Sequence, residues 1–263
     1  MLASILLAKI LADFLCQLLF SNFIAKPTQL ILYNNVGYNL KMRNLRIIST
    51  IIIILTFLGC SIKKYYFPIS ELTNGKVYKY ECKNEPNKTQ YWKITYNPEN
   101  KVLTTKAYES DFRQYELFKE KFTEEGTEVI EFISYIKNGK GRSIPLSNIP
   151  KDIDVFRWEK KDPYKYSAET LYAQNQKTIF SKEREFIGKS KIIILGKEYE
   201  AIKLKGSYKT IVVNSTDKFE YTQFSYYIKG IGLAKMEKEY SDGKKETLEL
   251  TEIMTIEQWN KRQ

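Results

Sequence analysis

The chain has 263 residues, of which 43% are hydrophobic and 28% are charged, and its 42 Lys and Arg against 31 Asp and Glu give a formal net charge of +11. It contains no histidine, which excludes Ser-His-Asp and Cys-His catalysis and histidine-based metal sites. The basic residues are mostly lysines spread among glutamates, with no arginine-rich block, so the composition does not favour nucleic-acid binding. We expect no cofactor and no metal, and one domain of ordinary size or two small ones that share a sheet.

An apolar run over residues 47–59 contains no charged side chain. It is shorter than the roughly 20 residues of a membrane-spanning helix and fits the about 7–15 residues of a signal-peptide hydrophobic region. Met42, Arg43 and Arg46 stand before it as a basic N-terminal region, and Leu58-Gly59-Cys60 ends it. This order resembles a bacterial lipoprotein signal peptide.

The resemblance implies a mature protein that begins at Cys60. The signal, residues 42–59, is then removed by cleavage between Gly59 and Cys60, Cys60 carries a diacylglycerol anchor, and residues 60–74 form a tether. No acidic residue stands near Ser61, which by resemblance to lipoprotein sorting signals implies the outer membrane, facing the periplasm. The expected partner is therefore a membrane, bound through lipid.

Residues 1–41 precede this signal and begin with another apolar stretch. Lys9, Asp13 and Gln17 recur in it every four residues, which places them on one stripe of a helix. Either these residues are a mis-assigned extension and the true start is Met42, or they form a second membrane-seeking helix. We favour the first interpretation, because a lipoprotein signal works only when it follows a short basic N-terminus.

From Lys76 onward, short segments alternate apolar and polar residues and are rich in Tyr, Val, Ile and Thr, a pattern typical of β-strands. Turn residues separate them, most clearly at Gly196-Lys197 and Asp242-Gly243. Connections this short join antiparallel neighbours. The sequence therefore predicts an all-β fold over residues 75–263, a mainly antiparallel sheet that is curved or forms a half-barrel, with a short C-terminal helix capped by Thr255.

Residues 143–172 do not follow this alternation and contain Pro145, Pro150 and Pro163. We interpret them as a loop-rich connection, with a short helix near Ala168–Gln174, that divides the domain into two blocks of strands.

Aromatic residues recur on the predicted strands and either line an apolar cavity in a curved sheet or fill its core. The candidates for contact with an apolar ligand are Tyr78, Tyr80, Trp92, Tyr96, Phe219 and Tyr221. Further aromatic residues of this kind are Phe118, Phe122, Phe132, Phe224 and Tyr226. Cys82 shares the phase of Tyr78 and Tyr80 and is predicted to be a buried small hydrophobic residue. The scattered glutamates are interpreted as the solvent face of the strands.

The stretch YYIKGIGLAKMEKEYSDGKKETLELTEI, residues 226–253, resembles the last hairpin of envelope proteins with an antiparallel half-barrel sheet, a group that includes lipoprotein carriers and receptors. We interpret its glycines, Gly230 and Gly232, as places where the sheet bends or two layers approach closely. The resemblance implies a concave sheet that holds lipid or another apolar ligand. We therefore expect a membrane-anchored envelope lipoprotein that binds without catalysis; a structural or protein-binding lipoprotein and a carboxylate-based hydrolase remain alternatives.

Overall fold

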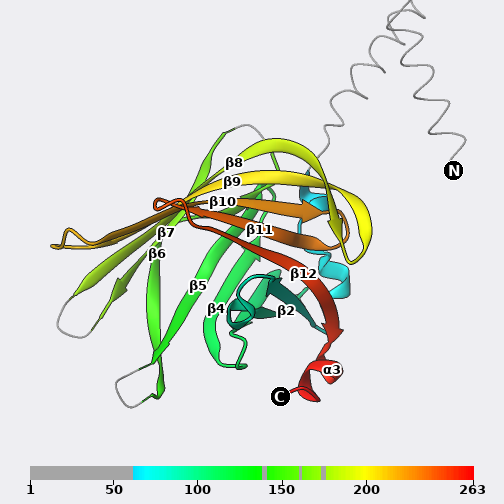
Figure 1. Cartoon of the computed structure of the whole chain (residues 1–263), viewed down its shortest axis with the longest axis horizontal. Helices are drawn as coiled ribbons and strands as arrows, with labels where there is room; N and C mark the ends of the chain where they lie inside the picture. Colours follow the sequence, from blue (N-terminus) through cyan, green and yellow to red (C-terminus); the bar gives the residue numbers. More distant parts are fainter. Residues whose placement is uncertain (1–61, 138–140, 160–161, 173–175) are drawn as a thin grey trace, which may run out of the picture. The chain divides into compact units, whose positions relative to one another are not determined.

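The computed structural model describes residues 62–137, 141–159, 162–172 and 176–263. Within these ranges, twelve antiparallel strands pair in chain order, and β1 also pairs with β12, so the sheet closes into a barrel (Figure 1). The strands are β1 (Lys76–Cys82), β2 (Gln90–Asn97), β3 (Val102–Tyr108), β4 (Gln114–Phe122), β5 (Gly126–Lys137), β6 (Ser143–Arg157), β7 (Tyr164–Leu171), β8 (Lys177–Ile194), β9 (Lys197–Val212), β10 (Lys218–Ile228), β11 (Gly232–Tyr240) and β12 (Lys245–Thr255). The helices are the 3-10 turns η1 (Ile62–Tyr65), η2 (Ile69–Glu71) and η3 (Pro86–Lys88), and α3 (Ile256–Asn260).

The all-β antiparallel fold predicted from the alternating pattern is confirmed. Gly196 and Gly243 lie in the turns between β8 and β9 and between β11 and β12, with φ of 74° and 81°, a conformation that glycine adopts without steric cost. The Thr255 side chain caps α3, because its hydroxyl oxygen accepts a hydrogen bond from the backbone N–H of Gln258 at 3.2 Å. The predicted lipidation and cleavage residues, Cys60 and Gly59, lie outside the described residues.

The predicted connection over residues 143–172 is wrong, because these residues form β6 and β7. Ala168–Leu171 is strand, so the predicted helix there is also wrong. Pro150 is tolerated because the pairing between β6 and β7 is irregular there, with a register shift between Pro150 and Ile153, and a residue without an N–H fits such a place in a sheet. Pro163 lies between β6 and β7, just before β7 begins. The two predicted strand blocks are therefore one continuous sheet.

The predicted tether is wrong for its described part, because residues 62–74 pack into the barrel instead of leading away from it. The buried side chains are Ile62, Tyr65, Tyr66, Phe67 and Leu72. The Tyr66 ring lies 4.7 Å from the ring of Phe156, centroid to centroid. These apolar and aromatic side chains gain burial that an extended tether would not give them.

Gly232, at the start of β11, allows this segment to approach closely. A Cβ atom at Gly232 would stand 2.5 Å from Cδ1 of Phe67, which is closer than two non-bonded carbon atoms approach each other. The expectation that a glycine of this hairpin lets two layers approach closely is thus confirmed.

Three apolar clusters stabilise the described part of the barrel, one of which joins Phe118, Val155 and Tyr166. The main interior core draws on the 62–74 segment, β1 and β9 to β12, and its Tyr78, Tyr80 and Leu248 are at most 1% exposed. A smaller core lies outside the barrel wall, where Trp259 of α3 packs on Tyr91 with 5.1 Å between ring centroids. Cys82 is buried, as predicted. No described helix has the length and apolar character needed to cross a membrane.

Candidate functional site

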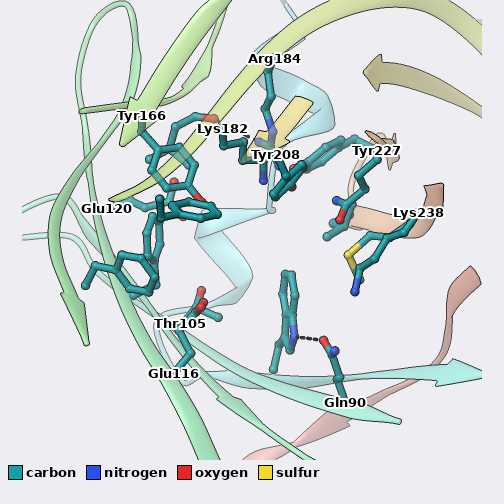
Figure 2. Close-up of a pocket in the computed structure, with 18 of the residues that line it drawn as sticks. Gln90, Thr105, Glu116, Glu120, Tyr166, Lys182, Arg184, Tyr208, Tyr227 and Lys238 are labelled. Carbon is teal, nitrogen blue, oxygen red and sulfur yellow. Dashed lines mark hydrogen bonds between the residues drawn. The ribbon is translucent and has the colours of Figure 1, made fainter. Parts of the chain in front are cut away.

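The interior of the barrel holds a cavity of about 410 Å³ (Figure 2). This is at the small end of the about 300–1,000 Å³ typical of sites for small molecules. Side chains reach it from the 62–74 segment and from strands β2 to β11, because alternate residues of each strand point inward. The lining residues are Tyr66, Phe67, Gln90, Trp92, Thr105, Tyr115, Glu116, Phe118, Glu120, Phe132, Val155, Tyr166, Phe180, Lys182, Arg184, Tyr208, Tyr221, Gln223, Tyr227, Leu233, Met236 and Lys238.

Aromatic rings form a continuous part of the cavity wall. Phe118 packs edge-on against Phe132, with centroids 5.4 Å apart, and Tyr166 packs on Phe180 at 5.6 Å. Tyr208 stacks on Tyr221 at 4.5 Å. Edge-to-face and offset contacts of this kind hold rings in fixed orientations, so this wall offers a firm apolar surface to a ligand.

Two cations stand on the inner face of β8. Lys182 and Arg184 are two residues apart and therefore point to the same side of the strand, and both are buried, with exposures of 7% and 6%. The Lys182 Nζ lies 4.4 Å from the centroid of the Tyr208 ring, and Arg184 Nη1 donates to the carbonyl of Val155 at 3.1 Å. Burial, together with the charge of Arg184, lowers the pKa of Lys182 well below its ordinary value.

Two carboxyl groups reach the cavity from β4. Glu120 accepts hydrogen bonds from the hydroxyls of Tyr66 at 2.5 Å and Thr127 at 2.7 Å. Burial raises its pKa, and these bonds oppose the rise. Burial also raises the pKa of Glu116, to about 7, with the charge of Lys182 opposing it. Glu116 is therefore partly protonated near neutral pH.

The remaining polar groups of the wall are held by neighbouring side chains. The Gln90 amide oxygen accepts from Tyr115 Oη at 2.9 Å and from Trp92 Nε1 at 3.2 Å, the second of which is drawn in Figure 2. Lys238 pairs with Glu246 at 3.0 Å. In the part of the chain that the structure describes, no three His, Cys, Asp or Glu side chains gather as a metal site would require.

The six aromatic residues proposed from the sequence lie in different places. Trp92 and Tyr221 are on the cavity wall. Tyr78 and Tyr80 belong to the close-packed core, where the Tyr80 hydroxyl donates to the Leu233 carbonyl at 2.9 Å. Tyr96 packs on Phe122 beside this core. Phe219 is 54% exposed and does not line the cavity, although its ring lies 5.6 Å from that of Tyr221, centroid to centroid.

Sequence reasoning missed the charged residues of the wall. The interpretation of the glutamates as solvent-facing is wrong for Glu120, which is 5% exposed. A signal was present: Lys182 and Arg184 share the strand phase of Phe180 and Phe186, just as Glu116 and Glu120 share that of Phe118 and Phe122. A charged residue in phase with inward-facing aromatic residues points inward itself.

The chain matches no known protein-family model and no curated protein. Among solved structures, it is similar to an inferred lipoprotein of Parabacteroides distasonis ATCC 8503, with 12% identity and a TM-score of 0.44 over 74% of this chain and 99% of that one. It is also similar to an inferred exported protein with a YmcC-like fold from Bacteroides fragilis NCTC 9343, with 11% identity and a TM-score of 0.46 over 74% and 99% of the two chains. A third similarity is to the hypothetical lipoprotein YmcC of Escherichia coli K12, with 6% identity and a TM-score of 0.33 over 70% and 88%.

Proposed function

We propose that this protein binds a small amphipathic organic molecule, or part of a lipid, inside the barrel without transforming it. The observation that supports this is the interior cavity of about 410 Å³, whose walls combine fixed aromatic rings with a few buried charged groups. Sites for small molecules are usually concave and mostly apolar, with a small number of polar groups that orient the ligand.

A binding role is favoured over catalysis by the kinds of residue present. The chain has no histidine, and no cysteine is among the side chains that line the cavity. Glu120 is engaged by Tyr66 and Thr127. The wall thus lacks a nucleophile with an adjacent histidine base, and we assign its polar groups to recognition.

We further propose that the protein is a lipoprotein of the cell envelope, anchored through Cys60 and located on the periplasmic face of the outer membrane. The support is the order of basic, apolar and small residues before Cys60, and Ser61 after it. Incorporation of labelled palmitate tests this proposal. Label is expected in the wild type and lost in Cys60→Ala, and label retained by Cys60→Ala would contradict the assignment.

Partner binding is a second candidate function, favoured by exposed isoleucines on β5 and β6. Ile136 and Ile144 are cross-strand partners and are 37% and 39% exposed. Exposed apolar groups that lie together are found at protein interaction sites.

The cavity proposal is tested with the uncharged probe N-phenylnaphthylamine, whose fluorescence rises in apolar surroundings. Thr105 and Thr104 are neighbours on β3, but only Thr105 lines the cavity. Thr105→Phe fills part of the cavity and is expected to weaken probe binding about tenfold or more. Thr104→Phe, the same change on the opposite face of the same strand, is expected to leave binding unchanged.

Circular dichroism shows whether both variants keep the fold. Wild-type protein that does not bind the probe, or a folded Thr105→Phe that binds it as tightly as the wild type, would overturn the proposed site.

A further inference from the structure

The charges around the cavity are not matched in pairs. Lys182 and Arg184 are both more than nine-tenths buried and line the cavity, yet among the described residues neither forms an ion pair with a carboxylate. A buried cation without an anionic partner is costly. Two such cations on one strand face therefore point to a partner that comes from outside the chain.

The protein's own contacts leave donors on both side chains. The Lys182 Nζ stands over the rings of Tyr208 and Tyr166, at 4.4 and 5.6 Å from their centroids, and Arg184 gives one hydrogen bond to the Val155 carbonyl. An ammonium carries three donors and a guanidinium five. The hydroxyls of Tyr164, Tyr208 and Tyr227 take up further donors of Arg184. The three donors of Lys182 and the remaining donor of Arg184 are available to a group inside the cavity.

The carboxyl groups of the wall act on Lys182 through their charge, but among the described residues neither forms an ion pair with Lys182 or Arg184. The hydroxyls of Tyr66 and Thr127 donate to Glu120, and Figure 2 shows Glu116 on the far side of the cavity from Lys182. Lys238, the third cation of the wall, is already paired with Glu246. The side of the cavity next to β8 therefore has a positive excess.

We infer that the ligand carries a carboxylate, which binds Lys182 and Arg184, while its apolar part lies against the aromatic wall formed by Phe118, Phe132 and Phe180. The inference rests on the proposed binding function and deepens it by naming the charge of the ligand. A carboxylate that contacts both cations makes charge-assisted hydrogen bonds, which are stronger than hydrogen bonds between neutral groups. The apolar part of the ligand gains burial in the same event.

The experiment compares decanoate with decanol, which share a chain and differ in the charged group. Each displaces N-phenylnaphthylamine from the full-length protein, and the concentration for half displacement gives relative affinity. Decanoate is expected to bind at least tenfold more tightly than decanol. Lys182→Met is expected to weaken decanoate binding by about tenfold to a hundredfold, as loss of a charge-assisted bond does, and to leave decanol binding unchanged.

Lys209→Met is the matched control. Lys209 follows Tyr208 on β9 and therefore points to the opposite face of the strand; its side chain is 52% exposed and pairs with Glu220 at 3.0 Å. This variant is expected to keep the wild-type preference for decanoate. Arg184→Met is a second test variant, expected to reduce the preference in the same direction as Lys182→Met.

Equal affinities of the wild type for decanoate and decanol would overturn the inference, and so would a folded Lys182→Met or Arg184→Met that keeps the full preference for decanoate. Both results leave the proposed function standing, because the probe still binds. Absence of probe binding is the different result that overturns the proposed function itself. If one variant does not fold, the wild-type comparison of decanoate with decanol and the other variant still test whether a carboxylate binds these two side chains.

Discussion

The interior of this barrel is built in two different ways. Beside β1 and β12 it is close-packed, and Tyr80, Leu248 and Leu250 are at most 1% exposed. Facing β4 and β8 it is hollow and holds buried charges, among them Glu120 and Lys182. The first region is what stability alone favours. The second carries charged groups that a well-packed apolar interior would not need, and it is the region in which the proposed binding function places the ligand.

The largest expected effect comes from truncating matched leucines in the two regions. Leu248→Ala removes a fully buried side chain from the packed core and should reduce the free energy of unfolding by about 2–5 kcal/mol. Leu233→Ala removes a side chain from the cavity wall, so the new space joins an existing one and the loss should be smaller. Urea unfolding of both variants measures the difference. Equal losses would mean that the wall is packed as tightly as the core.

The same contrast explains what the sequence predicts well and what it does not. Alternation in segments such as those around Tyr78 and Tyr80 reports inward-facing residues directly, and the turns at Gly196 and Gly243 follow from local backbone preference. The packing of Tyr66 into the barrel has no local signal, because it depends on contacts with Phe122 and Phe156, far away in the chain. Closure of the sheet also requires β1 to meet β12, a pairing between the two ends of the domain.

The candidate site was harder to predict than the fold for a physical reason. A lysine or glutamate on a strand is ordinarily exposed, and Lys182 and Glu120 are exceptions that only their phase relative to Phe180 and Phe122 reveals. β6 was missed because its prolines and irregular register hide the alternation. Both features, the inward direction of Lys182 and Glu120 and the irregular pairing of β6, are set by tertiary contacts.

A smaller effect is expected from Tyr66→Phe, which deletes a hydroxyl that donates to buried Glu120. Loss of a hydrogen bond to a buried charged group should reduce the free energy of unfolding by about 1.5–3 kcal/mol. Tyr65→Phe is the matched control, because the Tyr65 hydroxyl donates to Glu200 at 2.7 Å, and Glu200 is exposed.

Tyr65→Phe should change stability by less than about 1 kcal/mol, because water replaces the lost donor at an exposed carboxylate. Thermal unfolding of the two variants compares the same chemical change in two environments. Similar losses would indicate that Glu120 is reached by water and that the charged side of the interior is not dry.

The smallest expected effect depends on pH and isolates the cost of charge in the cavity. The pKa of Glu116 is raised by burial to about 7, whereas in the unfolded chain it lies near about 4.3. Between these two values the folded protein binds more protons than the unfolded one, so Glu116 makes stability fall as pH rises through this window. Complete loss of this titration would correspond to about 3.7 kcal/mol at pH 8. Because Glu116 keeps part of its contact with solvent and the glutamine that replaces it is also a polar group with a cost of burial, Glu116→Gln should raise the free energy of unfolding at pH 8 by about 1 kcal/mol. At pH 4 the gain should vanish, since Glu116 is then neutral in the folded state and largely neutral in the unfolded one. Thermal unfolding at both pH values measures the two differences, and a gain of equal size at pH 4 and pH 8 would show that packing, and not charge, is what the substitution changes.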